Sequence, residues 1–280
     1  MTPDFAFSAF AKSAGDFDRH INDSIRGYDH LRRDCVDYSR YFIQEGTVVL
    51  DVGCSEGTLL RSIRDAHQGA RPKARYLGID VESKFGELWR ALSADNVEYA
   101  VRDAVSFDGY ENLSLALSIF TLQFIPERHR LCLLRRIHDG MIEGGALIIA
   151  EKVRARSATF QEMLTFPYYD HKRRRFTAEQ ILDKERSLRG FMIPWDEERL
   201  ESALDAAGFD VQRFWQNHLF AAWIAHKGTR RSMAGLVLPR ETRPLKRPRR
   251  PSIIDPGDGL DVFFKVDRKV TRHLEYDQAR

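Results

Sequence analysis

The segment that decides how this chain folds is Val48-Val49-Leu50-Asp51-Val52-Gly53-Cys54-Ser55-Glu56-Gly57. An apolar, β-branched run ends in an acidic residue, Asp51, and two glycines then bracket a short turn. Glycine lets the backbone approach a ligand closely, and the helix that such a turn opens offers free N–H groups. A dinucleotide-binding loop would read Gly-x-Gly-x-x-Gly, whereas the spacing here is Gly-x-x-x-Gly. A carboxylate at Asp51 repels phosphate but suits a positively charged amine; the pattern alone also describes an ordinary strand–helix turn.

Two further acidic residues end apolar runs downstream of this segment. Asp80 follows Gly78 and Ile79, and Asp103 follows Arg102. In doubly wound folds, a carboxylate at the end of the second strand accepts hydrogen bonds from both hydroxyls of a ribose. We interpret Asp103 as an acceptor for an adenine amine, with capping of the following helix as the alternative. An amino acid, a ribose and an adenine without phosphate together describe S-adenosylmethionine.

Strand and helix patterns alternate between residues 47 and 152. Short apolar runs rich in β-branched residues are separated by segments with helical spacing. Runs this apolar favour strands buried on both faces, as in a parallel sheet covered by helices. Residues 209–215 and 218–227 predict an antiparallel hairpin at the sheet edge. The predicted fold is α/β, with a Rossmann-like, doubly wound and mostly parallel sheet.

Three parts follow one another along the chain, and the second contains a predicted lid. Residues 1–45 have the helical spacing of an N-terminal cover, and residues 46–227 form the predicted ligand-binding domain. Within that domain, the polar and Arg-rich residues 153–195 interrupt the alternation and predict a lid. Residues 228–280 are basic and rich in proline, which is typical of an extended linker.

Composition limits the classes of function. The 280 residues carry a formal charge of +3, but residues 227–251 hold nine Lys or Arg against one acidic residue. The basic character is therefore local, and an RNA contact through this tail stands beside the simpler interpretation of a solvated linker. The sequence contains no apolar stretch that could span a membrane and no metal-ligand or disulfide spacing among its three cysteines, and we expect no secretory signal. We expect a cytoplasmic protein that uses no metal.

Six segments resemble the carboxy-S-adenosylmethionine synthases, a family within the class I methyltransferase superfamily. The resemblance extends from about residue 16 to residue 227, and it implies the class I methyltransferase sheet with a helical N-terminal cover and a lid. The segments are SIRGYDHL (24–31), LDVGCSEG (50–57), SIFTLQFIPERHR (118–130), GGALIIAEK (144–152), YYDHKRRRFTAEQI (168–181) and DKERSLRGFM (183–192).

The resemblance also implies an activity. The family converts S-adenosylmethionine and prephenate into carboxy-S-adenosylmethionine and phenylpyruvate, for wobble-uridine modification of tRNA. It implies Arg186 as the catalytic residue that binds the new carboxylate, in its own or a neighbouring subunit of a homodimer, since a guanidinium holds a carboxylate bidentately and keeps its charge. The implied contacts to S-adenosylmethionine, or to its carboxylated form, are Tyr28, Gly53, Cys54, Ser55, Asp80, Val81, Asp103, Ala104 and Ile119.

The sequence departs from the family at several positions. Ile119 and Val81 stand where the family usually has asparagine, and Phe176 replaces a tyrosine. One extra residue lies between Phe176 and Arg186. Two alternatives therefore stay open: a methyltransferase that acts on a different small-molecule or RNA acceptor, and a binding protein of this fold without turnover.

The predicted lid supplies candidates for contacts with an acidic substrate. Tyr169, His171 and Arg173 lie in a basic and aromatic cluster, for which a solvated loop is the alternative. Glu151 and Lys152 end the preceding strand, and we expect them to form an ion pair with Glu151 lining the pocket. Tyr28, on the leading helix, is interpreted either as a core aromatic residue or as a cover over the cofactor.

Overall fold

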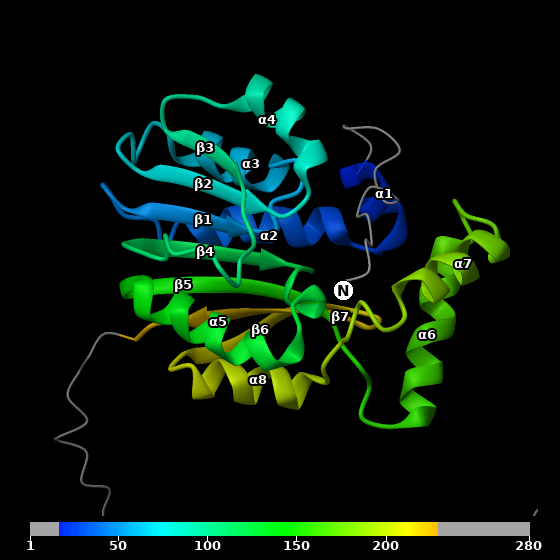
Figure 1. The fold of residues 1–280 in the computed structure, drawn as a ribbon. Helices are drawn as coiled ribbons and strands as arrows, with labels where there is room; N and C mark the ends of the chain where they lie inside the picture. The colour runs from blue at the N-terminus through cyan, green and yellow to red at the C-terminus, as the bar shows by residue number, and fades with distance from the viewer. Residues whose placement is uncertain (1–16, 229–280) are drawn as a thin grey trace, which may run out of the picture. The chain divides into compact units, whose positions relative to one another are not determined.

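The computed structural model describes residues 17–228; the predictions for residues 1–16 and for the basic tail at 229–280 lie outside this part of the chain. The described residues form a seven-stranded sheet in the order β3-β2-β1-β4-β5-β7-β6 (Figure 1). The first five strands in this order are parallel, β7 runs antiparallel to β5, and β6 completes a hairpin with β7. The predicted doubly wound sheet with an antiparallel edge hairpin is confirmed. The strands are β1 (Val48–Val52), β2 (Arg75–Asp80), β3 (Val97–Val101), β4 (Leu113–Ile119), β5 (Met141–Lys152), β6 (Asp210–Asn217) and β7 (Phe220–His226).

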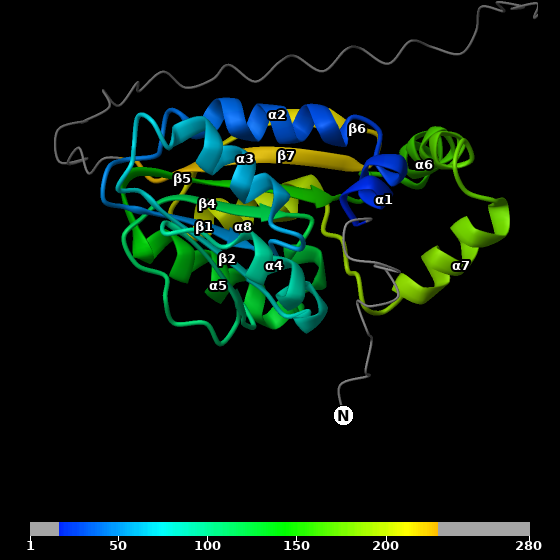
Figure 2. The same ribbon diagram turned by 90° about the horizontal axis from the view of Figure 1, so that it is seen from above.

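Helices cover both faces of the sheet (Figure 2). In the middle of β5, Leu147 and Ile149 enter the core shared with α5 and α8, while Ile148 and Ala150 enter the core shared with α2 and α3. Both faces of the strand are apolar because both are buried, as the unbroken apolar run predicts. The helices, including two short 3-10 turns, are α1 (Phe17–Ser24), α2 (Tyr28–Ser39), α3 (Thr58–His67), η2 (Ser83–Phe85), α4 (Gly86–Leu92), η3 (Leu122–Phe124), α5 (Glu127–Gly140), α6 (Ala158–Lys172), α7 (Ala178–Leu188) and α8 (Glu197–Ala206).

The N-terminal helices are tied to the glycine turn. The backbone N–H groups of Phe17 and Asp18 donate to the two carboxylate oxygens of Glu56, at 3.1 and 3.5 Å. A carboxylate at the first turn of a helix satisfies N–H groups that have no partner within the helix and complements the helix dipole. Glu56 therefore holds the start of α1 over the turn that follows β1.

Residues 153–195 contain two helices, α6 and α7, that lie beyond the carboxyl ends of the parallel strands (Figure 1). Ser157 caps α6 by accepting from the N–H of Phe160, and Thr177 and Gln180 form a reciprocal capping box at the start of α7. The basic cluster that begins at Tyr168 is therefore mostly helical, since α6 continues to Lys172. Within residues 17–228, no helix has both the length and the apolar character needed to cross a membrane.

Candidate cofactor and substrate site

The glycine turn after β1 has a backbone that only glycine accepts without strain. Gly53 and Gly57 have φ values of +79° and +73°, in the left-handed region. A Cβ on Gly53 would collide with the side chain of Thr121, and one on Gly57 would collide with the ring of Tyr99. Thr121 follows β4 and Tyr99 lies within β3, so side chains from both sides of β1 pack closely against the turn.

Asp80 organises this turn. Its Oδ2 accepts from the N–H of Ser55 at 3.0 Å, and its Oδ1 accepts from the N–H of Glu82 at 3.0 Å. Burial raises the pKa of Asp80, and these backbone hydrogen bonds oppose the rise. Each carboxylate oxygen has a second lone pair, so binding of ribose hydroxyls is compatible with this arrangement. The sequence predicted a binding role alone, whereas the structure adds a role in positioning the turn.

A cluster of three carboxylates, which we call the acidic cluster, consists of Asp18, Asp51 and Asp80. Asp51 is only 3% exposed, and its pKa is raised to about 8 by burial and by the nearby charges of Asp80 and Asp18. Arg32 pairs with Asp18 at 3.3 Å, so the cluster keeps a negative surplus. A cation bound here would relieve the repulsion between the carboxylates. Glycine backbone and carboxylates therefore fit a ligand with an ammonium and a sulfonium group.

Asp103 and Ala104 follow β3, beside Asp80. The N–H of Arg102 donates to the carbonyl of Asp80 at 2.8 Å, which places this turn at the same edge. Asp103 is exposed, and its Oδ1 accepts from the N–H of Val105 at 2.8 Å. One oxygen thus caps a turn at residues 104–106, where the alternative interpretation expected a helix. The adenine contact stays a prediction for the other oxygen.

The carboxyl edge of the sheet also carries apolar side chains, those of Tyr28, Val81 and Ile119. Tyr28 begins α2, is buried, and lies 6.1 Å from Phe120 between ring centroids. Ile119 ends β4 and is partly buried against the same core, whereas Val81 is exposed. Tyr28 is a core aromatic residue, and because Asp51 contributes to its raised pKa, it also lies near the acidic cluster.

Glu151 does not form the expected ion pair with Lys152. Its two oxygens accept from the N–H groups of Leu122 and Gln123 at 2.8 and 2.9 Å, so it caps η3. Lys152 instead pairs with Glu185 of α7 at 3.5 Å. Burial raises the pKa of Glu151 to about 8. The prediction of a Glu151–Lys152 pair is wrong because the backbone turn after β4 takes the carboxylate.

The predicted lid residues differ in their burial and in their contacts. Tyr169 is partly buried, with its ring centroid 5.6 Å from that of Tyr168. Both ring nitrogens of His171 are buried, and within residues 17–228 neither has a hydrogen-bond partner. Arg173 is exposed at the end of α6. Arg186 is 73% exposed and pairs with Asp183 at 3.1 Å, so within one chain it faces solvent rather than the acidic cluster.

Several residues that shape the site are missed by the sequence analysis. Asp18 and Glu56 act through the placement of α1, which no local motif reveals. Lys172 and Lys184 lie within the quoted segments 168–181 and 183–192, yet only the folded lid shows that they are neighbours, because Lys172 lowers the pKa of Lys184.

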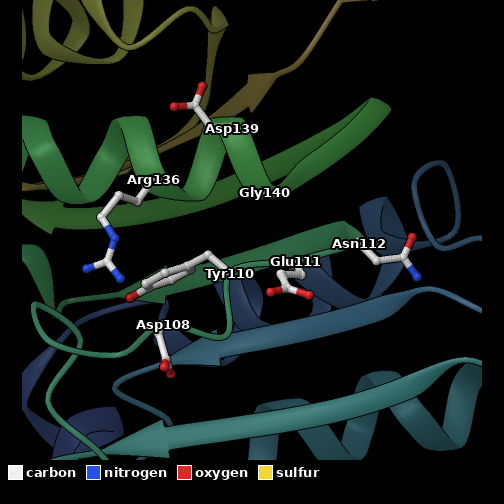
Figure 3. Close-up of a pocket in the computed structure, with 7 residues that line it drawn as sticks. All are labelled: Asp108, Tyr110, Glu111, Asn112, Arg136, Asp139 and Gly140. Atoms are coloured by element: carbon white, nitrogen blue, oxygen red, sulfur yellow. The ribbon is translucent and has the colours of Figure 1, made fainter.

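The cavity drawn in Figure 3 lies at the opposite end of the sheet. It has a volume of about 500 Å³, and Asn112 and Gly140 among its lining residues precede β4 and β5. These residues lie at the amino ends of the strands, whereas the glycine turn lies at the carboxyl ends. The cavity is therefore separate from the candidate site. Ligands of open α/β sheets bind outside the carboxyl ends of the strands. The lining residues are Asp108, Tyr110, Glu111, Asn112, Arg136, Asp139 and Gly140.

Known proteins are similar to this chain in fold and in sequence. A family model described as a methyltransferase domain matches residues 49–145. The carboxy-S-adenosyl-L-methionine synthase of Methylococcus capsulatus is 33% identical over 224 residues, covering 76% of this chain and 90% of that protein. The synthase of Staphylococcus epidermidis is 28% identical over 219 residues, covering 77% of this chain and 94% of that protein.

A solved structure supports the fold independently. Human N-acetylserotonin methyltransferase in complex with SAM is 17% identical, with a TM-score of 0.53, over 82% of this chain and 61% of that chain. The described sheet and the family match together identify an enzyme with the fold of the S-adenosylmethionine-dependent methyltransferases. The chain belongs to the carboxy-S-adenosyl-L-methionine synthase family.

Proposed function

We propose that this enzyme binds S-adenosylmethionine at the acidic cluster and carboxylates its methyl group with prephenate as the donor. The observation that carries the proposal is the buried Asp51 beside Asp80 and Asp18, in a family of carboxy-S-adenosyl-L-methionine synthases. In the balanced reaction, prephenate loses its ring carboxylate and its hydroxyl group and becomes phenylpyruvate. The methyl carbon loses a proton and gains the carboxylate, and the proton and hydroxyl leave as water.

The residues of the edge have separate tasks in this proposal. Asp80 accepts the ribose hydroxyls while its bond to Ser55 keeps the glycine turn in place. Asp51 and Asp18 balance the positive charges of the ligand. Tyr28 and Ile119 offer apolar surface that excludes water from the reacting methyl group.

Mass spectrometry of the nucleoside formed from S-adenosylmethionine and prephenate tests the proposal. We expect a carboxylated nucleoside that appears only when both substrates are present. Unmodified S-adenosylmethionine after prolonged incubation would contradict it. S-adenosylhomocysteine formed with an RNA or small-molecule acceptor would favour an ordinary methyltransferase, an alternative that the apolar Ile119 and the exposed Val81 support.

We further propose that the enzyme is a homodimer in which α6 and α7 meet a second copy. Phe160, Met163 and Phe166 follow one another at helical spacing along α6 and are all exposed, as is Leu182 of α7. Monomeric proteins rarely leave a large apolar patch uncovered. A second copy on this surface would carry Arg186 toward a neighbouring acidic cluster. Light scattering should give two chains for the wild type and one chain for Phe166→Glu; a monomeric wild type would contradict the proposal.

Arg186 is the residue that should distinguish the two forms of the cofactor. The carboxylated form carries an extra negative charge, so Arg186→Ala should weaken its binding by tenfold or more, equivalent to about 1.4 kcal/mol, and change S-adenosylmethionine binding little. Lysine should restore the affinity only in part, because it lacks the planar fork. Two titrations per variant measure this, and equal losses for both ligands would remove the assigned role.

The remaining parts of the proposal concern the cellular role. We propose that the enzyme acts in the cytoplasm and that its product supplies wobble-uridine modification of tRNA. This role is the one implied by the resemblance to the carboxy-S-adenosylmethionine synthases. Detection of the carboxymethylated wobble nucleoside in cells with the gene, and its loss without it, would test the proposal.

A further inference from the structure

A second charged group lies beside the acidic cluster, at the base of the lid. Lys152 ends β5, Lys172 ends α6, and Lys184 and Glu185 lie in α7. The ammonium groups of Lys152 and Lys172 each lie 5.2 Å from the ring centroid of Tyr168. We call these five residues the lysine cluster. Figure 1 shows α6 and α7 beyond the carboxyl end of β5, where the cluster lies.

The lysine cluster has more positive than negative charge. Lys152 pairs with Glu185 at 3.5 Å, and Glu185 is also the carboxylate that favours the charged form of Lys172. Lys172 is only 5% exposed, and its ammonium group donates to the hydroxyl of Tyr168 at 3.3 Å, a neutral acceptor. Lysine is almost never buried without a charged partner, so one carboxylate shared by two ammonium groups leaves room for an anion.

Two further bases, Lys184 and His20, lie near this group, and their charged forms are disfavoured. Burial and the charge of Lys172 lower the pKa of Lys184 to about 7. Burial, Lys184 and Lys172 lower the pKa of His20 in α1, which faces the cluster. An anion placed between these groups would favour their charged forms and offset the cost of their burial.

An aromatic wall connects the lysine cluster with the acidic cluster. The ring of Tyr168 lies 5.3 Å from that of Phe220, and Phe220 lies 5.6 Å from Phe120. Phe120 in turn packs against Tyr28. A molecule bound by its anionic end at the lysines would therefore place an apolar ring along this wall, toward the edge that holds the acidic cluster.

We propose that the lysine cluster binds the carboxylate of the pyruvyl group of the second substrate, and this inference rests on the proposed function, which takes prephenate as that substrate. The second carboxylate of prephenate, on the ring, then lies on the side of the acidic cluster. Charge separates the two ligands: the cation enters at the aspartates and the dianion is held at the lysines.

A purely structural role for the same residues makes a different prediction. If Lys152 and Glu185 serve only to fasten α7 to β5, removal of either partner loosens the lid. If the lysines bind a carboxylate, Glu185 competes with the ligand, and its neutralisation tightens binding. Glu185→Gln thus has opposite expected effects in the two cases.

Calorimetric titration with phenylpyruvate tests the proposal without turnover, because this probe keeps the pyruvyl carboxylate and lacks the ring carboxylate. The variants are Lys172→Met, Lys152→Met and Glu185→Gln, each saturated with S-adenosylmethionine. The control is Lys73→Met, which changes an exposed lysine before β2. We expect at least a tenfold loss of affinity in the first two variants, at least a threefold gain in the third, and no change in the control.

Three results would overturn the proposal: a wild type that does not bind phenylpyruvate, unchanged affinity in Lys172→Met, or weaker binding in Glu185→Gln together with a lower free energy of unfolding. Product analysis separates this failure from that of the proposed function. Carboxylated nucleoside with an unchanged KM for prephenate in Lys172→Met would keep the function and remove the lysine site. Lysine-dependent binding of phenylpyruvate without any carboxylated product would keep the site and remove the function.

Discussion

The acidic cluster and the lysine cluster lie at the same edge of the sheet, yet they carry opposite charge. The aspartates gather around a glycine turn fixed by strand ends, and one of them has its pKa raised to about 8 by burial and by its neighbours. The lysines gather where a lid helix folds back onto β5. Partial burial weakens screening by water in both places. In our proposal, this contrast draws a cationic and an anionic reactant to neighbouring but separate positions.

The largest effect on this contrast is expected from Asp80→Ala. The change removes the acceptor for the N–H groups of Ser55 and Glu82 and, in our proposal, for the ribose. Charge-assisted hydrogen bonds contribute about 1.5–3 kcal/mol each, so S-adenosylmethionine affinity should fall about a hundredfold. Calorimetry measures this, with Asp103→Ala as the control, because Asp103 is exposed and should cost only a few-fold. Unchanged affinity in Asp80→Ala would remove the ribose assignment.

A smaller and pH-dependent effect is expected from Asp51→Asn. Burial raises the pKa of Asp51 from 3.8 to about 8, so between these pH values the folded state binds a proton that the unfolded state lacks. Stability from this group is therefore full below about pH 4 and is lost as pH rises through about 8. Asparagine removes this dependence.

Urea unfolding without ligand measures the difference. Asp51→Asn should match the wild type near pH 4 and exceed its free energy of unfolding at pH 8.5 by about 1 kcal/mol or more. Asp95→Asn, at an exposed site, should show neither change. Glu151 is present in all three proteins, so its own titration cancels. A variant less stable than the wild type at pH 8.5 would contradict the burial of a charged Asp51.

The smallest effect is expected from removal of the residues after Gly228. Lys227 ties the C-terminal end of the described residues to the start of β5. Its ammonium group donates to the carbonyls of His138 and Met141 at 2.8 and 2.7 Å. A chain that keeps Lys227 should bind S-adenosylmethionine within twofold of the wild type. A truncated protein that folds but no longer binds this ligand would show that the tail completes the site. Filter binding with RNA at increasing salt would test the separate prediction of an RNA contact.

The fold could be predicted because its causes are local. Parallel strands buried on both faces leave continuous apolar runs, and the glycine turn and the carboxylates come directly after such runs, as at Asp51 and Asp80. Parallel strands end at one edge, so these residues meet without any knowledge of the lid. The acidic end of the site is thus largely contained in the sequence pattern.

The basic end depends on contacts between distant segments. Glu151 ends its strand like the aspartates, but the N–H groups of Leu122 and Gln123 take its carboxylate and leave Lys152 to Glu185. Glu185 and Arg186 are adjacent in sequence but lie on different faces of α7. Glu185 lies on the face that meets β5, and Arg186 lies on the face exposed to solvent. Local composition does not set that face, so the lysine cluster could not be predicted from it.

The central claim is that the two clusters bind two ligands of opposite charge. Paired titrations of Asp51→Asn and Lys172→Met with S-adenosylmethionine and with phenylpyruvate test it most directly. We predict that Asp51→Asn loses affinity for S-adenosylmethionine alone and that Lys172→Met loses affinity for phenylpyruvate alone. Equal losses of both ligands in both variants would contradict the claim, because they would indicate one shared site rather than two.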